Sequence, residues 1–142
     1  MKHFLLYTNV VIDFLIDRRP FSLTAAKLFD YSEKGKVKLH LTAVSYNNTY
    51  YILKKLTSHK ETIKILKEIE RITETIDTTH EAIKKALDSE FKDFEDAIQY
   101  YSASINKKLD CIVTRDISGF KLSKIPVLTP EEAVGLIESA SR

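Results

Sequence analysis

Three short segments carry polar side chains of the types that bind divalent cations and handle phosphate esters. Tyr7-Thr8-Asn9 ends an apolar run, Asp93 and Asp96 stand three residues apart, and Asp116 follows a second apolar run. Residues i and i+3 share one face of a helix, so Asp93 and Asp96 can act together. Clustered carboxylates suit hard cations such as magnesium, which activate water and neutralise a phosphodiester.

Each of these acids also has a purely structural explanation. Acidic residues at a helix start complement the helix dipole, which accounts for Asp93 and Glu95 without any chemistry. Asp116 can simply open a turn. Glu95 is expected to point away from the cluster, about 100° of helical rotation from its neighbours. Asp96 is harder to explain structurally, because the adjacent Ala97-Ile98 looks core-facing.

Strands and helices are predicted to alternate along the chain. The predicted strands cover 4–7, 37–41, 72–76, 109–114 and 125–128. The predicted helices cover 8–17, 22–35, 45–56, 60–72, 80–87 and 93–106, with a last one starting at 130. This alternation predicts an α/β fold with a mostly parallel sheet and helices on both faces. Ligands of such sheets bind beyond the carboxyl ends of the strands, where the three polar segments fall.

Two helices have an expected cap or buried face. Ser22 is expected to cap the second helix, and Thr78-Thr79 the fifth. The expected inward residues of the second helix are Leu23, Ala26, Leu28, Phe29 and Tyr31. Those of the sixth helix are Phe94, Ala97, Ile98, Tyr101 and Ile105.

Composition indicates an ordinary globular protein. The 142 residues are 44% hydrophobic and 30% charged, which fits one domain over 1–142. No apolar run is long enough to span a membrane, and no signal peptide is recognisable. With Cys111 as the single cysteine, a reducing cytoplasm is the expected setting. The net charge of +2 is too small to argue for nucleic-acid binding by itself.

Taken together in order and spacing, these segments resemble the PIN-domain family over nearly the whole chain. The opening Phe4–Leu15 looks like the family's first strand and helix, where the usual pattern is Leu-Leu-Asp-Thr-Asn. The stretches 93–100 and 112–116 resemble its second and third acidic motifs, and 125–132 resembles a recurrent tail. The resemblance implies a three-layer α/β/α sandwich, single-stranded RNA as substrate, and magnesium or manganese as cofactor. Many bacterial members are toxins of toxin–antitoxin pairs, so a homodimer and a small antitoxin partner are also implied.

Five positions match the family's site residues. Asp96 matches the central metal ligand, Asp116 the late acidic position, and Asp93 a supporting acid. Thr8 would orient a metal-bound water, and Thr8 with Asn9 would shape the floor of the site.

Three positions depart from the family's pattern. Tyr7 stands in the place of the first aspartate, Asn48 where many members have glutamate, and Gly119 where some have another aspartate. A phenol with a pKa near 10 stays neutral at pH 7 and does not replace a carboxylate on magnesium. We therefore expect a weakly active or inactive nuclease. The alternative is a non-catalytic module that keeps affinity for RNA or an antitoxin.

Basic and aromatic residues give weaker signals. Arg18, Arg19 and Arg115 lie nearest the expected crevice and are the better phosphate candidates. The lysines of two neighbouring helices could also meet phosphates, although a solvated face explains them at least as well: Lys54, Lys55, Lys60, Lys64 and Lys67. Core or dimer packing is the expected role of Tyr46, Tyr50 and Tyr51. The four histidines show no ligand spacing, and Cys111 is expected to be inert core.

Overall fold

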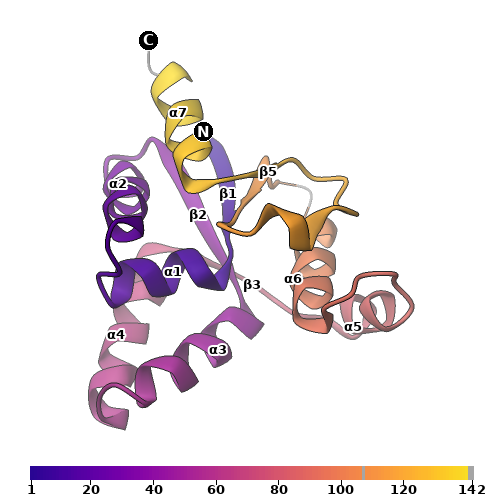
Figure 1. Cartoon of the computed structure of the whole chain (residues 1–142), viewed down its shortest axis with the longest axis horizontal. Helices are drawn as coiled ribbons and strands as arrows, with labels where there is room; N and C mark the ends of the chain where they lie inside the picture. The colour runs from indigo at the N-terminus through magenta and orange to yellow at the C-terminus, as the bar shows by residue number, and fades with distance from the viewer. Residues whose placement is uncertain (107, 141–142) are drawn as a thin grey trace.

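A five-stranded parallel sheet forms the centre of the molecule, with strand order β3-β2-β1-β4-β5 (Figure 1). The computed structural model describes residues 1–106 and 108–140. The strands are β1 (Lys2–Leu6), β2 (Val37–Thr42), β3 (Glu74–Ile76), β4 (Cys111–Val113) and β5 (Val127–Leu128). The predicted parallel sheet is thus confirmed, and each predicted strand overlaps an observed one.

The central strand β1 is buried on both faces, as its continuous apolar sequence predicts. Phe4 pairs with Cys111 and Leu6 with Val113 in the parallel register between β1 and β4. On the other side of β1, Leu5 pairs with His40 of β2. At the sheet edge, the Pro126 carbonyl accepts a 2.9 Å hydrogen bond from the Ile112 amide. The proline donates nothing to the ladder, in keeping with the predicted edge position of β5.

The connections between strands are helical. The helices are α1 (Thr8–Leu15), α2 (Phe21–Glu33), α3 (Ala43–Lys54), α4 (His59–Ile72), α5 (His80–Leu87), α6 (Phe94–Ile105) and α7 (Pro130–Ala140), with a short 3-10 turn η1 (Ile117–Phe120). None of the helices in the described part of the chain combines the length and apolar character needed to cross a membrane.

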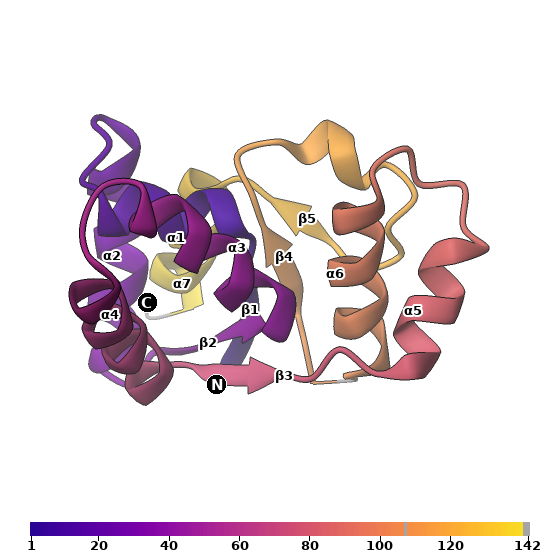
Figure 2. The same ribbon diagram turned by 90° about the horizontal axis from the view of Figure 1, so that it is seen from below.

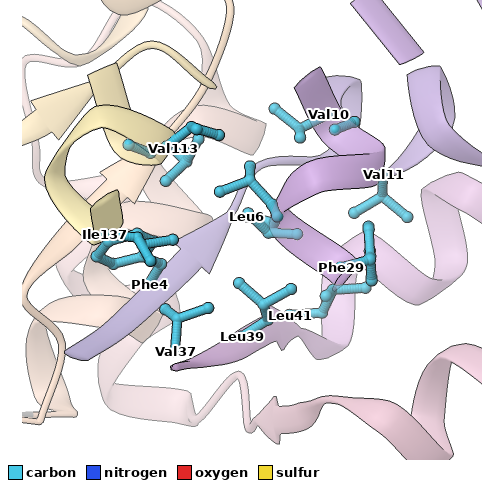
Figure 3. Close-up of a cluster of buried hydrophobic side chains, with 14 of the residues drawn as sticks. Phe4, Leu6, Val10, Val11, Phe29, Val37, Leu39, Leu41, Val113 and Ile137 are labelled. Atoms are coloured by element: carbon cyan, nitrogen blue, oxygen red, sulfur yellow. The ribbon is translucent and has the colours of Figure 1, made fainter. Parts of the chain in front are cut away.

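The helices cover both faces of the sheet, which makes the predicted three-layer sandwich (Figure 2). One face packs against α1, α2, α4 and α7 through a large cluster that includes Phe4, Leu6, Leu39 and Val113 (Figure 3). The opposite face packs against α6 through a smaller cluster that includes Leu5 and Ile112. Cys111 lies in the larger cluster, and burial raises the pKa of its thiol to about 12, as expected of an inert core cysteine.

Side-chain caps begin several helices where the sequence suggests them. Thr79 accepts a hydrogen bond from the Ala82 amide at the start of α5, which confirms that predicted cap. Pro130 occupies the first position of α7. The prediction for Ser22 is wrong: it lies inside α2, buried, and its hydroxyl donates to Asp17 Oδ1 at 2.7 Å. The chain enters α2 through Pro20 instead.

The predicted buried faces of α2 and α6 are partly wrong. Leu28, Phe29 and Ala97 are buried as expected. The exposed residues among the expected inward set are Leu23, Ala26, Phe94 and Ile105. The buried positions that replace them are Ala25 on α2 and Tyr100 and Ala103 on α6. Both helices carry apolar residues around more than half of their circumference, so hydrophobicity alone does not orient them.

Candidate active site

Neighbouring strands bring two of the predicted polar segments together. β1 and β4 run parallel and side by side, and the Tyr7 amide donates to the Val113 carbonyl at 2.9 Å just beyond their ends. Asn9 then bridges the two segments: its Nδ2 donates to Thr114 Oγ1 at 3.2 Å, and its Oδ1 accepts from the Arg115 amide at 3.4 Å. That Asn9 shapes the floor of the site stays a prediction beside these observed contacts.

The Tyr7 hydroxyl lies among the carboxylates of α6. It donates to Asp96 Oδ1 and lies 3.1 Å from Glu95 Oε1. The ring is held edge-on against Phe120, with 5.2 Å between the ring centroids. The expectation that Glu95 points away is therefore wrong. Its side chain is long enough to reach the Tyr7 hydroxyl although Glu95 and Asp96 leave the helix in different directions.

Burial disfavours the charged form of the acidic groups in this cluster. The pKa of Asp96 and that of Glu95 are both raised, chiefly because burial disfavours the charged carboxylate, while the Tyr7 hydrogen bond opposes that shift. The pKa of Tyr7 is raised far above its usual value by burial and by the same two carboxylates. Tyr7 is consequently a neutral hydrogen-bond donor at physiological pH.

The turn η1 packs against the Asp96 carboxylate on the side of Oδ2. An added Cβ at Gly119 would lie 2.6 Å from Asp96 Oδ2 and 3.7 Å from Asp116 Oδ2. Asp96 and Asp116 thus converge around the Gly119 backbone, as their sequence positions predict. The Ser118 hydroxyl donates to Asp116 Oδ1 at 2.5 Å. This arrangement leaves no room for an aspartate at position 119 while Asp96 keeps its place.

Asp93 has the structural role that its sequence position also allows. Its Oδ1 accepts a 2.9 Å hydrogen bond from the Asp96 amide and so caps α6. Asp93 also borders the same pocket as Asp96. A supporting role toward a metal therefore stays a prediction beside an observed capping role.

A buried polar layer lies beneath the carboxylates. The Thr8 hydroxyl donates to Ser45 Oγ at 3.1 Å and accepts from Gln99 Nε2 at 3.0 Å. Both Thr8 and Gln99 are buried, and Gln99 Oε1 and Asn48 Nδ2 have no hydrogen-bond partner among the described residues. Sequence reasoning missed Gln99; the signal was an amide between the buried Ala97 and Tyr100 of one helix. Thr8 holds α1 to α3 and α6, and its role toward a water stays a prediction.

The three arginines predicted to meet phosphate are all paired with carboxylates. Arg115 donates hydrogen bonds from Nε and Nη2 to the buried Asp13 carboxylate, at 2.5 and 3.2 Å. Its guanidinium carbon lies 4.2 Å from the centroid of the Phe21 ring. Arg18 lies 3.7 Å from the same Asp13. Arg19 contacts Asp17 at 3.4 Å. Binding of nucleic acid by these arginines stays a prediction, and for Arg115 it would break a buried ion pair.

The donors present do not fit magnesium or manganese while Tyr7 is in place. One oxygen of Asp96 accepts the Tyr7 hydrogen bond, and the residues at positions 7 and 48 are neutral. Across residues 1–106 and 108–140, no group of three or more His, Cys, Asp or Glu side chains is arranged to hold a metal ion. A hard cation bound with only part of a carboxylate set would be held weakly.

Comparison with known proteins agrees with the observed fold. A family model described as PIN domain matches residues 3–118. The structure resembles DNA-bound VapBC from Salmonella typhimurium (16% identity, 92% of this chain and 99% of that chain, TM-score 0.68). It also resembles VapBC2 from Rickettsia felis bound to a promoter DNA fragment (12%, 89% and 98%, 0.67) and a toxin-antitoxin complex from Klebsiella pneumoniae (23%, 89% and 96%, 0.65). No curated protein sequence matches the chain significantly.

Proposed function

Since the chain belongs to the PIN-domain family, we propose that it is an RNA-directed module of a toxin–antitoxin pair whose nuclease centre is closed by Tyr7. Its ancestry is that of a single-stranded RNA endonuclease dependent on magnesium or manganese. With Tyr7 in place, cleavage is weak or absent. The observation that carries this proposal is the Tyr7 hydroxyl donating to Asp96 beside Glu95.

The phenol acts against a cation in two ways. It removes a negative charge from the position where the family has its first aspartate, and it occupies a lone pair of Asp96. Packing of the ring against Phe120 keeps the hydroxyl in that place. Asp96, Asp116, the buried Thr8 and the half-buried Asn9 are all still present, so the rest of the site's framework is retained.

The similar solved structures bear on the partners that we propose for this chain. Solved structures with this fold include VapBC assemblies and a toxin-antitoxin complex, and they cover nearly the full length of both chains. This likeness supports a small antitoxin partner for this chain. A homodimer is proposed from the family resemblance alone. Single-stranded RNA is the nucleic acid proposed for the crevice at the strand ends.

Manganese-dependent cleavage of a mixed-sequence single-stranded RNA tests the proposal, using the wild type, Tyr7→Asp and Tyr7→Phe. We expect Tyr7→Asp to cleave about 100-fold faster than the wild type and to stop on addition of a chelator. Tyr7→Phe removes the hydroxyl but keeps the ring, restores no charge, and should remain inactive. Wild-type cleavage as fast as that of Tyr7→Asp would show that Tyr7 does not close the site.

The second candidate function is a binding module that has left catalysis, and Tyr7 favours it too. Thermal melts with and without manganese separate the two. If Tyr7 alone disables the metal site, manganese should raise the melting temperature of Tyr7→Asp by several degrees and leave that of the wild type unchanged. If Tyr7→Asp is neither stabilised by manganese nor active, the binding-module function replaces the nuclease.

A further inference from the structure

A pocket of about 460 Å³ opens beside Asp96, between the start of α6 and the segment around η1. Gly119 of η1 lies against the Asp96 carboxylate in the first turn of α6. The residues around the pocket that matter here are Phe91, Lys92, Asp96, Gly119, Lys121 and Leu122. The pocket is therefore continuous with the acidic centre but extends well beyond it.

Two lysines give the pocket its unpaired positive charge. Lys92 precedes α6 and Lys121 follows η1, and both are exposed. No carboxylate of residues 1–106 or 108–140 forms a salt bridge with either ammonium group. The arginines of the site differ, because all three are already paired with Asp13 or Asp17. Lys92 and Lys121 are the cations beside Asp96 that remain available to an anion.

Apolar side chains also line the pocket. Phe91 is half-buried and packs against Tyr100, with ring centroids 5.3 Å apart, and against Phe120 at 6.4 Å. Leu122 contributes an exposed apolar surface, with 52% of the residue accessible to solvent. A nucleobase has an apolar face that packs well on such side chains.

We propose that this pocket holds one nucleotide of a single-stranded RNA, with Lys92 and Lys121 contacting its phosphate and Phe91 and Leu122 its base. The proposal rests on the proposed function, because it takes the RNA from there and assigns the protein surface that binds it. Glu90 and Asp93 also border the pocket, so its charge is mixed. A mixed pocket suits a nucleotide, which has a base to bury and one phosphate, better than it suits a chain of phosphates.

The test is fluorescence anisotropy of a short labelled single-stranded RNA, with the full-length protein in buffer containing EDTA. Lys92→Glu with Lys121→Glu should weaken binding about tenfold or more, because two phosphate contacts become repulsive. Leu122→Ala should weaken it about threefold through loss of contact with the base. The matched control is Lys64→Glu with Lys67→Glu, which makes the same charge change on exposed residues around another hollow, of about 450 Å³, at α4.

The outcomes separate this site from the proposed function. Loss of affinity in the pocket variant alone, with melting temperatures unchanged in both double variants, supports the site. Wild-type affinity in the pocket variant, or an equal loss in the α4 control, overturns the site while RNA binding itself stands. Absence of RNA binding by the wild type overturns the site together with the RNA-directed function, whatever Tyr7→Asp does with manganese.

Discussion

At Gly119 the backbone approaches the Asp96 carboxylate so closely that a methyl group would displace it. The added Cβ would lie 2.6 Å from Asp96 Oδ2, nearer than carbon and oxygen can pack. In Gly119→Ala the Asp96 side chain must rotate away, which breaks its hydrogen bond with Tyr7. We expect the free energy of unfolding to fall by about 1–2 kcal/mol, measured by urea denaturation at neutral pH.

Gly135 is the matched control for this substitution. It lies within α7, and an added Cβ there meets nothing within 4 Å. Gly135→Ala should raise the free energy of unfolding by about 0.5–1 kcal/mol, because alanine restricts the unfolded chain and favours the helix. If both substitutions stabilise the protein, Asp96 moves freely and the close approach at Gly119 does not hold it.

Residue identity predicted the members of the site better than their contacts. Asp96 and Asp116 converge at Gly119 as expected. Asn9 contacts Thr114 and the Arg115 amide, because both segments lie beyond the ends of the adjacent strands β1 and β4. The Tyr7 hydroxyl bond to Asp96 and the neighbouring Glu95 were not predicted. Those contacts depend on how α6 is rotated over the sheet, which spacing within one helix does not determine.

Between elements, an ion pair joins α1 to the segment after β4. Asp13 of α1 is almost fully buried and is held by two nitrogen atoms of Arg115, with Arg18 farther away at 3.7 Å. Arg115→Leu should lower the free energy of unfolding by about 3 kcal/mol, because it leaves a buried carboxylate with a single distant cation.

The partly exposed Arg18 provides the comparison. Arg18→Leu should lower the free energy of unfolding by less than about 1 kcal/mol, since Arg115 still neutralises Asp13. Chemical denaturation of both variants measures the difference. Equal losses would mean that Arg115 and Arg18 share the carboxylate, and Arg115 would then be freer to meet phosphate than the geometry indicates.

A histidine pair between adjacent strands makes stability depend on pH. His40 of β2 is fully buried, and its Nε2 lies 2.9 Å from Nδ1 of His3 on β1. Burial lowers the pKa of His40, with His3, Lys38 and Lys108 adding to that effect while Glu74 opposes it. The unfolded chain, with a histidine pKa near 6.5, therefore binds more protons than the folded chain in mildly acidic solution. Stability is full above about pH 6.5 and falls as the pH decreases below it.

Thermal melts between about pH 7.5 and 5.5 test this pair. The wild type should melt at progressively lower temperature as the pH falls, and His40→Gln should show a flatter dependence. His80→Gln, at an exposed histidine, is the control and should keep the wild-type slope. A wild-type slope in His40→Gln would place the responsible proton elsewhere. The pairing itself was not foreseen, because His3 and His40 are far apart in sequence and meet only through strand register.

At the scale of the whole molecule, the order and type of elements followed from the sequence. Continuous apolar runs mark strands buried on both faces, and side-chain caps such as Thr79 mark helix starts. The strand order and the buried faces of the helices could not be predicted from the sequence. They depend on which face of the sheet each connecting helix covers and on how that helix is rotated against it. Whether an arginine or lysine forms a salt bridge also depends on which side chains the folded structure brings next to it. That state matters most for the interaction with RNA.

The near-balance of charge over the whole molecule makes the salt dependence of RNA binding informative. With 22 basic and 20 acidic residues, the overall field is weak, so affinity must come from a few local contacts. Each phosphate neutralised on a single strand adds about −0.7 to the slope of log K against log salt concentration. In the proposed site Lys92 and Lys121 contact one phosphate, which predicts a slope of about −0.7 in anisotropy titrations over a range of salt. Engagement of the five lysines of the α3–α4 region would give about −3.5 and would place the RNA on that face.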